Sequence, residues 1–325
     1  MKKTLVALSV LAAAGSAQAI ELYNQDKVTV NMTGDVEVVY LQSTDKNDAY
    51  EGGFHQEIQD ADFGFDTRYA VNDDLQVGAF WEFKGTTDGK VSGTSTGNVY
   101  VGLYSQSVGS IRIGKLDTVL DDAGIGSDYQ FGIKSFFQNG SKFSVDEAVR
   151  YDIDKGTFYF SLAGAQDKND NSAIGKNGSW IDGKIGGRFA DFDISAFAGK
   201  AKIDDATPAP SSDESLYAVQ GRYEGVENLG LELGYYRVDG DAANPGTDIK
   251  TDTFGLAADY TLDAWKFAAG YSRASTDAAG AEDTNNWFVN AGYALAPSTT
   301  AYVEFGGTDE TDSQTGIAVG LKAEF

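Results

Sequence analysis

The chain contains no cysteine, and this absence excludes several kinds of protein. Without thiols there is no disulfide framework, no thiolate nucleophile and no cysteine-ligated zinc site. Proline occurs 4 times and methionine twice in 325 residues, against 39 glycines and 17 tyrosines. This balance favours many strands joined by tight turns over a helical protein.

Positive charge is also scarce. There are 25 Lys and Arg residues against 49 Asp and Glu, which gives a formal net charge of −24. A nucleic-acid partner is therefore not expected, because neutralising phosphates requires a basic face. Long apolar runs are missing as well, so no stretch approaches the ~20 residues of a membrane-spanning helix.

The first residues have the features of an export signal. Lys2 and Lys3 precede a short apolar run at 4–14, and Ala17-Gln18-Ala19 is a small-x-small cleavage site. This arrangement is typical of a secretory signal peptide. We therefore predict a signal peptide at 1–19 and a mature chain at 20–325, destined either for a soluble exterior compartment or for a membrane β-barrel.

The rest of the chain follows a period of two. Within 28–41 the even positions are apolar except for one glycine, while most odd positions as far as Glu37 are polar. The segments 61–71 and 75–83 repeat this alternation on either side of a short Asn72-Asp73-Asp74 turn. Such alternation predicts strands with one apolar and one polar face, here joined as a hairpin.

Sixteen such strands can be counted, and their connections alternate between short turns and long polar loops. An even number of strands of ~10 residues with this alternation is typical of a transmembrane β-barrel, whereas a soluble sandwich need not keep its short turns on one side. The further strands are expected near 98–105, 109–114, 147–152, 157–166, 179–189, 192–203, 215–223, 229–238, 251–260, 264–273, 285–294, 299–306 and 316–325.

The composition of the two faces supports a membrane barrel. Aromatic residues such as Trp81, Tyr260 and Trp287 lie near the ends of apolar faces, where they would form a girdle at the lipid headgroups. The opposite faces carry charged residues such as Glu82 and Arg188, too many for a dry core. These faces must therefore line water, and a barrel of ~16 strands is wide enough to enclose it.

Several short motifs, in order along the mature chain, resemble the general trimeric porins of Gram-negative outer membranes. They are Glu-Leu-Tyr-Asn-Gln-Asp at 21–26, Phe-Gly-Phe at 63–65, Val-Tyr-Val-Gly-Leu at 99–103, Gly-Ser-Ile-Arg-Ile-Gly-Lys at 109–115, Ala-Val-Arg-Tyr-Asp at 148–152 and a terminal strand at 317–325. The resemblance implies an all-β fold, namely a 16-stranded antiparallel transmembrane β-barrel whose third loop folds inward.

The resemblance also implies a passive water-filled channel for small hydrophilic solutes and ions. It further implies a homotrimer in the cell outer membrane, surrounded by lipid and lipopolysaccharide. The final aromatic residue, Phe325, resembles the signal by which the barrel-assembly machinery recognises its substrates. The third loop, at about 116–147, is the longest connection and would narrow the pore.

Charge at the narrowing decides which ions pass such a pore. Positions that are often basic in the family carry Asp35 and Asp62, while one cation is kept at Lys115. The sequence therefore predicts a cation-selective pore. The residues expected at the constriction are Asp35, Asp62, Asp66, Arg68, Arg112, Lys115, Asp117, Asp121, Asp122, Asp128 and Arg150.

Three alternatives to a general diffusion pore are open. An oligosaccharide-preferring porin could use the aromatic residues Phe80, Tyr100, Tyr104, Phe131, Phe136 and Phe137. A non-conducting barrel could act as an adhesin or structural protein. Catalysis is not expected, because the only histidine, His55, lies in a long loop without a nucleophile motif. No cofactor or dedicated metal site is expected, although loop carboxylates could hold divalent cations loosely.

Overall fold

The computed structural model describes residues 19–87, 90–134, 143–169, 174–204, 212–241 and 248–325. The predicted signal peptide lies outside this part of the chain apart from Ala19. Within the described residues, no helix has the length and apolar character needed to cross a membrane.

Strands make up almost all of the described chain, with one short 3-10 helix. Their bounds are β1 (Ile20–Gln25), β2 (Val28–Gln42), β3 (His55–Ala70), β4 (Leu75–Thr87), β5 (Lys90–Ser105), β6 (Gly109–Asp117), β7 (Ser144–Asp154), β8 (Phe158–Gln166), β9 (Ser179–Phe189), β10 (Phe192–Ile203), β11 (Ser212–Val226), β12 (Leu229–Asp241), β13 (Asp248–Leu262), β14 (Trp265–Thr276), β15 (Thr284–Ala296), β16 (Thr299–Thr308) and β17 (Gly316–Glu324), and the helix is η1 (Val119–Asp122).

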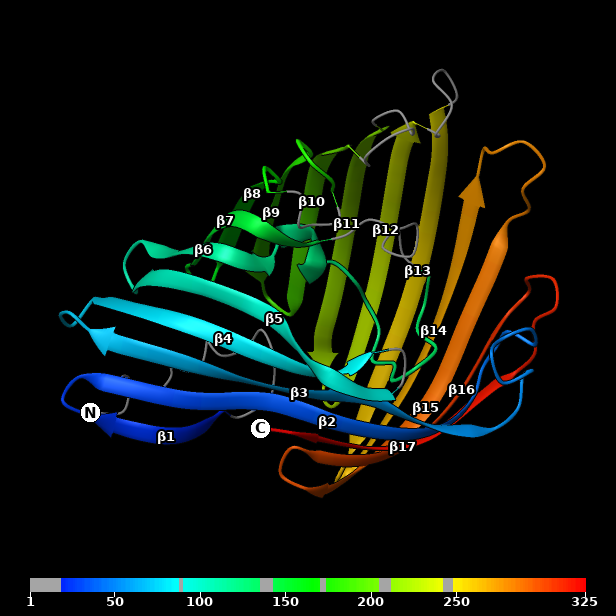
Figure 1. Ribbon diagram of the computed structural model, residues 1–325. Helices are drawn as coiled ribbons and strands as arrows, with labels where there is room; N and C mark the ends of the chain where they lie inside the picture. Colours follow the sequence, from blue (N-terminus) through cyan, green and yellow to red (C-terminus); the bar gives the residue numbers. More distant parts are fainter. Residues whose placement is uncertain (1–18, 88–89, 135–142, 170–173, 205–211, 242–247) are drawn as a thin grey trace.

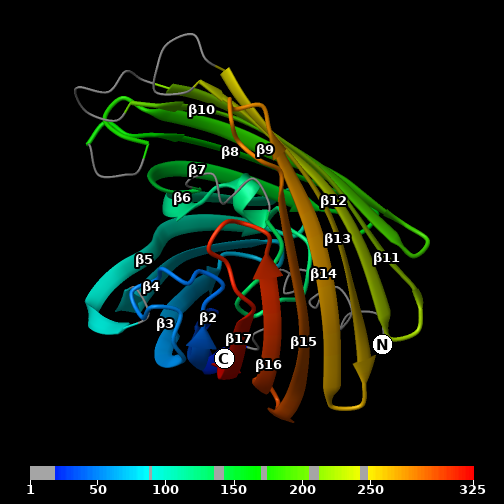
Figure 2. The ribbon, with the colours of Figure 1, turned by 90° about the vertical axis from the view of Figure 1, so that its right-hand side faces the viewer.

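The strands close into a barrel. Each strand from β2 to β17 pairs antiparallel with its successor, and β17 returns to pair with β2 from Ile317 opposite Gln42 to Glu324 opposite Asp35. Figures 1 and 2 show these strands curving round a central space. The predicted ring of 16 antiparallel strands is thereby confirmed.

The first strand, β1, is an addition that the sequence analysis missed. It pairs with the beginning of β2, with Ile20 opposite Met32. The end of β17 lies just beyond it, because Phe325 and Gly34 exchange two backbone hydrogen bonds of 2.6 and 2.8 Å. β1 and β17 therefore lie one after the other along β2. β1 supplies backbone hydrogen-bond partners to the part of β2 that β17 does not reach.

Two strands begin earlier than predicted. β3 starts at His55 rather than near 61, and β5 starts at Lys90 rather than near 98. The added segments are rich in polar residues on both faces. Beyond the lipid, both faces of a strand meet water, so the apolar alternation that reveals a strand is lost although backbone pairing continues.

The outer face of the barrel is apolar. Side chains of alternate residues, such as Trp81, Ile113 and Leu233, point outward and expose half or more of their surface. Exposed apolar area on this scale is unusual for a protein in water, and it fits an outer surface that faces lipid.

The connection between β6 and β7, residues 118–143, is called loop L3 below. Its apolar residues Val119 and Leu120 are fully buried in one cluster with Leu216 and Tyr236 of the barrel wall. Figure 1 shows the described part of L3 running inside the ring of strands. The third loop therefore folds inward, as predicted, and the barrel's largest buried core lies between this loop and the wall.

Candidate functional site

Loop L3 is anchored at its start by two side chains of the wall. The backbone N–H groups of Val119 and Leu120 donate to the Asp182 carboxylate of β9, at 3.2 and 2.8 Å. Arg150 of β7 donates to the Thr118 carbonyl at 2.9 Å and to the Asp122 carboxylate at 2.6 Å. The first turn of the loop is thus fixed to the wall on both sides.

The middle of L3 is held by two more wall carboxylates. Glu232 of β12 accepts the backbone N–H of Gly126 at 3.0 Å. Glu304 of β16 accepts the N–H groups of Tyr129, Gln130 and Phe131 at 2.6, 2.9 and 2.6 Å. Glu304 has no exposed surface, so these N–H groups supply the hydrogen bonds that a buried carboxylate requires.

The side chains at residues 129–131 reach the seam where the barrel closes. The Gln130 amide donates to Glu37 of β2 at 2.7 Å, and the Tyr302 hydroxyl donates to the same carboxylate. The Tyr129 ring stacks on Tyr302, with centroids 4.0 Å apart. The described residues of L3 therefore follow the wall from β9 through β12 and β16 to β2. The wall formed by β3 to β6, to which residues 118–134 make no hydrogen bond, is called the uncovered wall below.

The predicted acids of the uncovered wall are brought together. Asp35 on β2 and Asp62 on β3 are direct cross-strand partners. Lys322 lies 3.7 Å from Asp35, and Lys84 lies 3.3 Å from Asp62. Asp35 is the middle residue of β2, so this acidic pair lies near half height, where L3 narrows the barrel.

The predicted arginines form a second group on β3, β6 and β7. Arg68 binds Asp66 with a nitrogen–oxygen distance of 2.7 Å. Arg112 and Arg150 are cross-strand partners, and both ion-pair with Asp152, at 2.7 and 3.0 Å. Asp152 was not predicted as a site residue, yet its single carboxylate pairs with both arginines.

Lys115 does not join this group. It follows Gly114, whose φ of +145° accompanies a bulge in the pairing of β6 with β7. By the alternation along β6, Lys115 lies on the same side of the strand as the outward-facing Ile113 and not on the side of Arg112. Lys115 lies 3.7 Å from Asp146 and donates to the Thr96 carbonyl at 3.1 Å. The bulge is a backbone irregularity that the residue pattern did not reveal.

The acids of L3 and of the end of β6 differ in their surroundings. Asp122 is neutralised by Arg150 and by Lys184, each at 2.6 Å, and Asp117 accepts a hydrogen bond from the Asn98 amide at 2.6 Å. Burial raises the pKa of Asp121 to about 6, and the negative charges of Asp117 and Asp122 act in the same direction. Burial also raises the pKa of Asp128.

Lumenal cations of the described strands are all paired with carboxylates, whereas several lumenal acids have no basic partner there. A cation beside a carboxylate contributes little net field at a distance. The paired cations are Arg68, Lys84, Arg112, Arg150, Lys184, Arg188, Arg222, Lys266 and Lys322. The acids without an ion pair among the described residues include Asp60, Glu82, Asp121 and Asp128.

The aromatic residues of the uncovered wall contact one another and the arginines. Phe80 and Tyr100 are stacked with centroids 5.3 Å apart, and the Arg112 guanidinium lies 5.5 Å from the Tyr100 centroid. Arg68 lies 3.9 Å from the centroid of Tyr104. Phe131 packs on the wall near Gly306, and Phe136 and Phe137 lie outside the described residues.

Four wall residues that fix L3 were not among the predicted site residues. They are Glu37, Asp182, Glu232 and Glu304. All were recognisable as acids on the water-facing side of a strand. Only a three-dimensional structure pairs Asp182, Glu232 and Glu304 with backbone N–H groups of the loop and Glu37 with the side-chain amide of Gln130. Within the part of the chain that the structure covers, no group of three or more histidine or carboxylate side chains is arranged to hold a metal ion.

The sequence matches known proteins over its whole length. The model of the Gram-negative porin family matches residues 4–313. The chain is 31% identical to "Porin-like protein H" of Photobacterium profundum, with all of both chains covered. It is 26% identical to the "Monosaccharide porin" of a Halomonas species, over 94% of this chain and 81% of that one.

Solved structures share the fold at lower identity. A loop L8 deletion mutant of OmpT, an outer membrane protein of Vibrio cholerae, matches with a TM-score of 0.79 and 21% identity, over 92% of this chain and all of that chain. A trimer form of OmpT matches with a TM-score of 0.75 and 20% identity over the same shares. An anion-selective porin from Comamonas acidovorans has a TM-score of 0.75 at 17% identity, again over 92% and 100%.

Proposed function

The chain belongs to the Gram-negative porin family and forms an outer-membrane channel, and we propose that this channel conducts cations in preference to anions. Its solutes would be small and hydrophilic, and they would cross by passive diffusion. The channel is lined by polar faces of the strands and is narrowed by L3, which favours discrimination by size and charge.

The observation that supports cation preference is the unequal pairing of charges in the lumen. Every described lumenal cation lies beside a carboxylate, which weakens its attraction for anions. Glu82 and Asp121 lack such partners and leave a negative excess near the constriction. Even at a dielectric constant near 80, a unit charge at ~4 Å changes an ion's energy by about 1 kcal/mol. Two such carboxylates can therefore favour cations about tenfold or more.

Reversal potentials in a planar bilayer test this function. With a tenfold KCl gradient across the membrane, we expect a potential of the sign that corresponds to potassium permeating faster than chloride. A potential of the opposite sign would contradict the proposal while leaving the porin assignment intact.

An oligosaccharide-preferring pore is the second candidate, and similarity to a monosaccharide porin speaks for it. Sugar rings bind to exposed aromatic faces. Here Phe80 and Tyr100 stack on each other and Tyr104 is covered by Arg68, so non-specific diffusion is the better supported proposal. In liposome-swelling assays we expect rates that fall smoothly with sugar size, and no swelling at all would favour the adhesin or structural alternative.

The assembly proposals follow the family. We propose that the mature chain begins after Ala19, that Phe325 directs insertion by the barrel-assembly machinery, and that three copies associate among lipid and lipopolysaccharide. The trimer form of OmpT supports the oligomeric state. Electrophoresis of unheated samples should give a band of about three times the monomer mass.

A further inference from the structure

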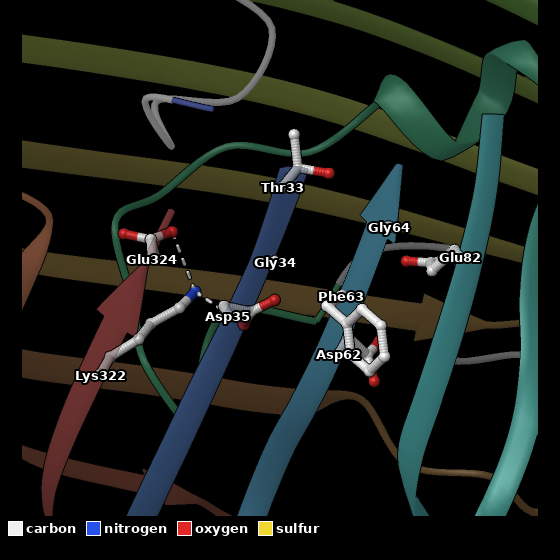
Figure 3. A pocket seen from close by; sticks show the side chains of 9 residues that line it. All are labelled: Thr33, Gly34, Asp35, Asp62, Phe63, Gly64, Glu82, Lys322 and Glu324. Carbon is white, nitrogen blue, oxygen red and sulfur yellow. Dashed lines mark ion pairs between the residues drawn. The ribbon is translucent and has the colours of Figure 1, made fainter. Parts of the chain in front are cut away.

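A cavity opens beside the constriction on the wall formed by β2, β3, β4 and β17. Its volume is about 220 Å³. Figure 3 shows Asp35 with Lys322 and Glu324 on one side of it and Asp62 and Glu82 on the other. The cavity is therefore formed mainly by side chains that the strand alternation directs into the lumen.

The lining of this cavity is strongly acidic. Four carboxylates, those of Asp35, Asp62, Glu82 and Glu324, face one lining ammonium group, that of Lys322. Lys322 lies 3.7 Å from Asp35 and 3.3 Å from Glu324. Even when Lys84, which ion-pairs with Asp62, is added, the carboxylates exceed the cations.

One oxygen of these carboxylates lacks a hydrogen-bond donor. Asp62 exposes 7% of its surface, and its Oδ1 accepts no hydrogen bond from any described residue. Its other oxygen, Oδ2, lies 3.3 Å from the Lys84 ammonium. A buried carboxylate oxygen without a donor is costly, and a small rotation of the carboxylate brings either oxygen towards the cavity, because this torsion is broad in Asp.

We infer that this cavity binds the primary ammonium or guanidinium group of small organic cations as they pass through the pore. Such a group supplies both the positive charge that the lining lacks and the N–H donor that Asp62 needs. The inference rests on the proposed cation preference and names the solutes that the same site would favour. A bare metal ion fits less well, because the described carboxylates do not converge on one point.

Block of potassium current by three monovalent cations tests the inference. Ethylammonium and guanidinium carry N–H donors, whereas tetramethylammonium has the same charge and none. We expect ethylammonium and guanidinium to reduce single-channel potassium current at concentrations about tenfold lower than tetramethylammonium does. The reason is that a charge-assisted hydrogen bond changes a binding constant by about tenfold or more. Equal block by all three cations would overturn the inference.

Two variants and a control locate the effect. Asp62→Asn should raise the half-blocking concentrations of ethylammonium and guanidinium about tenfold, and Asp35→Asn should raise them less. Asp259→Asn is the matched control, because Asp259 is also a lumenal acid paired with one lysine, Lys266, at 3.8 Å. If Asp259→Asn changed block as much as Asp62→Asn, or if neither Asp62→Asn nor Asp35→Asn changed it, the cavity would not be the binding site.

Two further measurements separate the possible failures. Reversal potentials in KCl are recorded on the same channels, so a cation-preferring pore without donor-dependent block would refute this inference alone. Magnesium is tested beside the organic cations. Stronger block by magnesium than by ethylammonium, relieved by Asp62→Asn, would overturn the inference in favour of a hydrated divalent cation.

Discussion

Asp121 is a loop residue whose protonation should change close to neutral pH. It lies in η1 at the start of L3, and its raised pKa of about 6 results mainly from burial and then from Asp117 and Asp122. Above pH 6 it is charged and contributes to the negative excess, and below pH 6 it becomes neutral. We therefore expect cation preference to fall as the pH decreases from 7 to 5.

The measurement is the reversal potential as a function of pH in a fixed KCl gradient. Asp121→Asn should lower the preference at pH 7 and reduce the change between pH 7 and pH 5. An Asp45→Asn variant in the first external loop serves as control and should keep the change. A pH profile unaffected by Asp121→Asn would show that another group titrates.

Charge reversal on the uncovered wall is a second prediction for single residues. Asp35→Lys combined with Asp62→Arg changes the local charge by four units beside the constriction, where each unit is worth about 1 kcal/mol at ~4 Å. The reversal potential should move towards the equilibrium potential of chloride. The same pair of changes at Asp45 and Asp48, in the external loop, should have much less effect, and an unchanged potential in the first variant would mean that this wall does not limit ion flow.

The sequence allowed some of these residues to be identified but not others. Asp35 and Asp62 could be placed in the lumen because they lie on the polar side of regular strands. Lys115 was placed there from the family resemblance, whereas its own position shares the alternation of the outward-facing Ile113. Partners such as Asp152 for the arginines depend on which strands are neighbours, and a residue pattern does not give those distances.

At the scale of elements, L3 depends on Glu304. This buried carboxylate accepts three backbone N–H groups of the loop. Glu304→Ala would leave them without an acceptor, at about 1–3 kcal/mol each, so the attachment should weaken by about 3 kcal/mol or more. We expect larger current fluctuations in single-channel recordings and admission of larger neutral polymers.

Glu304→Gln is the informative comparison, since its amide oxygen still accepts hydrogen bonds but carries no full charge. It should give an intermediate phenotype. The barrel itself should remain folded in both variants, because the pairing of β15, β16 and β17 does not involve the side chain. If Glu304→Ala changed neither the current fluctuations nor the size of the polymers admitted, the remaining contacts would be sufficient to hold the loop.

The strands were predictable where lipid meets one face and water the other. β2 and β4 were predicted nearly as they are, since apolar and polar residues alternate along most of each strand. The first part of β3 was not, because polar residues that meet water on both sides carry no such signal. The inward path of L3 followed from family resemblance, whereas its attachment to four strands through carboxylates required coordinates.

At the scale of the whole molecule, ion selectivity should depend on salt. The proposed preference results from charges spread around a water-filled lumen, and the screening length falls from ~10 Å at 0.1 M to ~3 Å at 1 M salt. The ratio of potassium to chloride permeability should therefore decrease as both solutions are made more concentrated at a constant gradient. A ratio independent of concentration would point to direct coordination of ions at one narrow site instead.

The way in which L3 is held also bears on how such pores diverge. Wall carboxylates accept hydrogen bonds from the main chain of L3 at Val119, Gly126 and residues 129–131. Any residue except proline supplies such a peptide N–H, whatever its side chain. Substitutions at these positions can therefore alter the opening of the pore while the hydrogen bonds that hold the loop persist. Protein engineers could exploit this freedom by varying the loop's side chains as a library on an unchanged barrel.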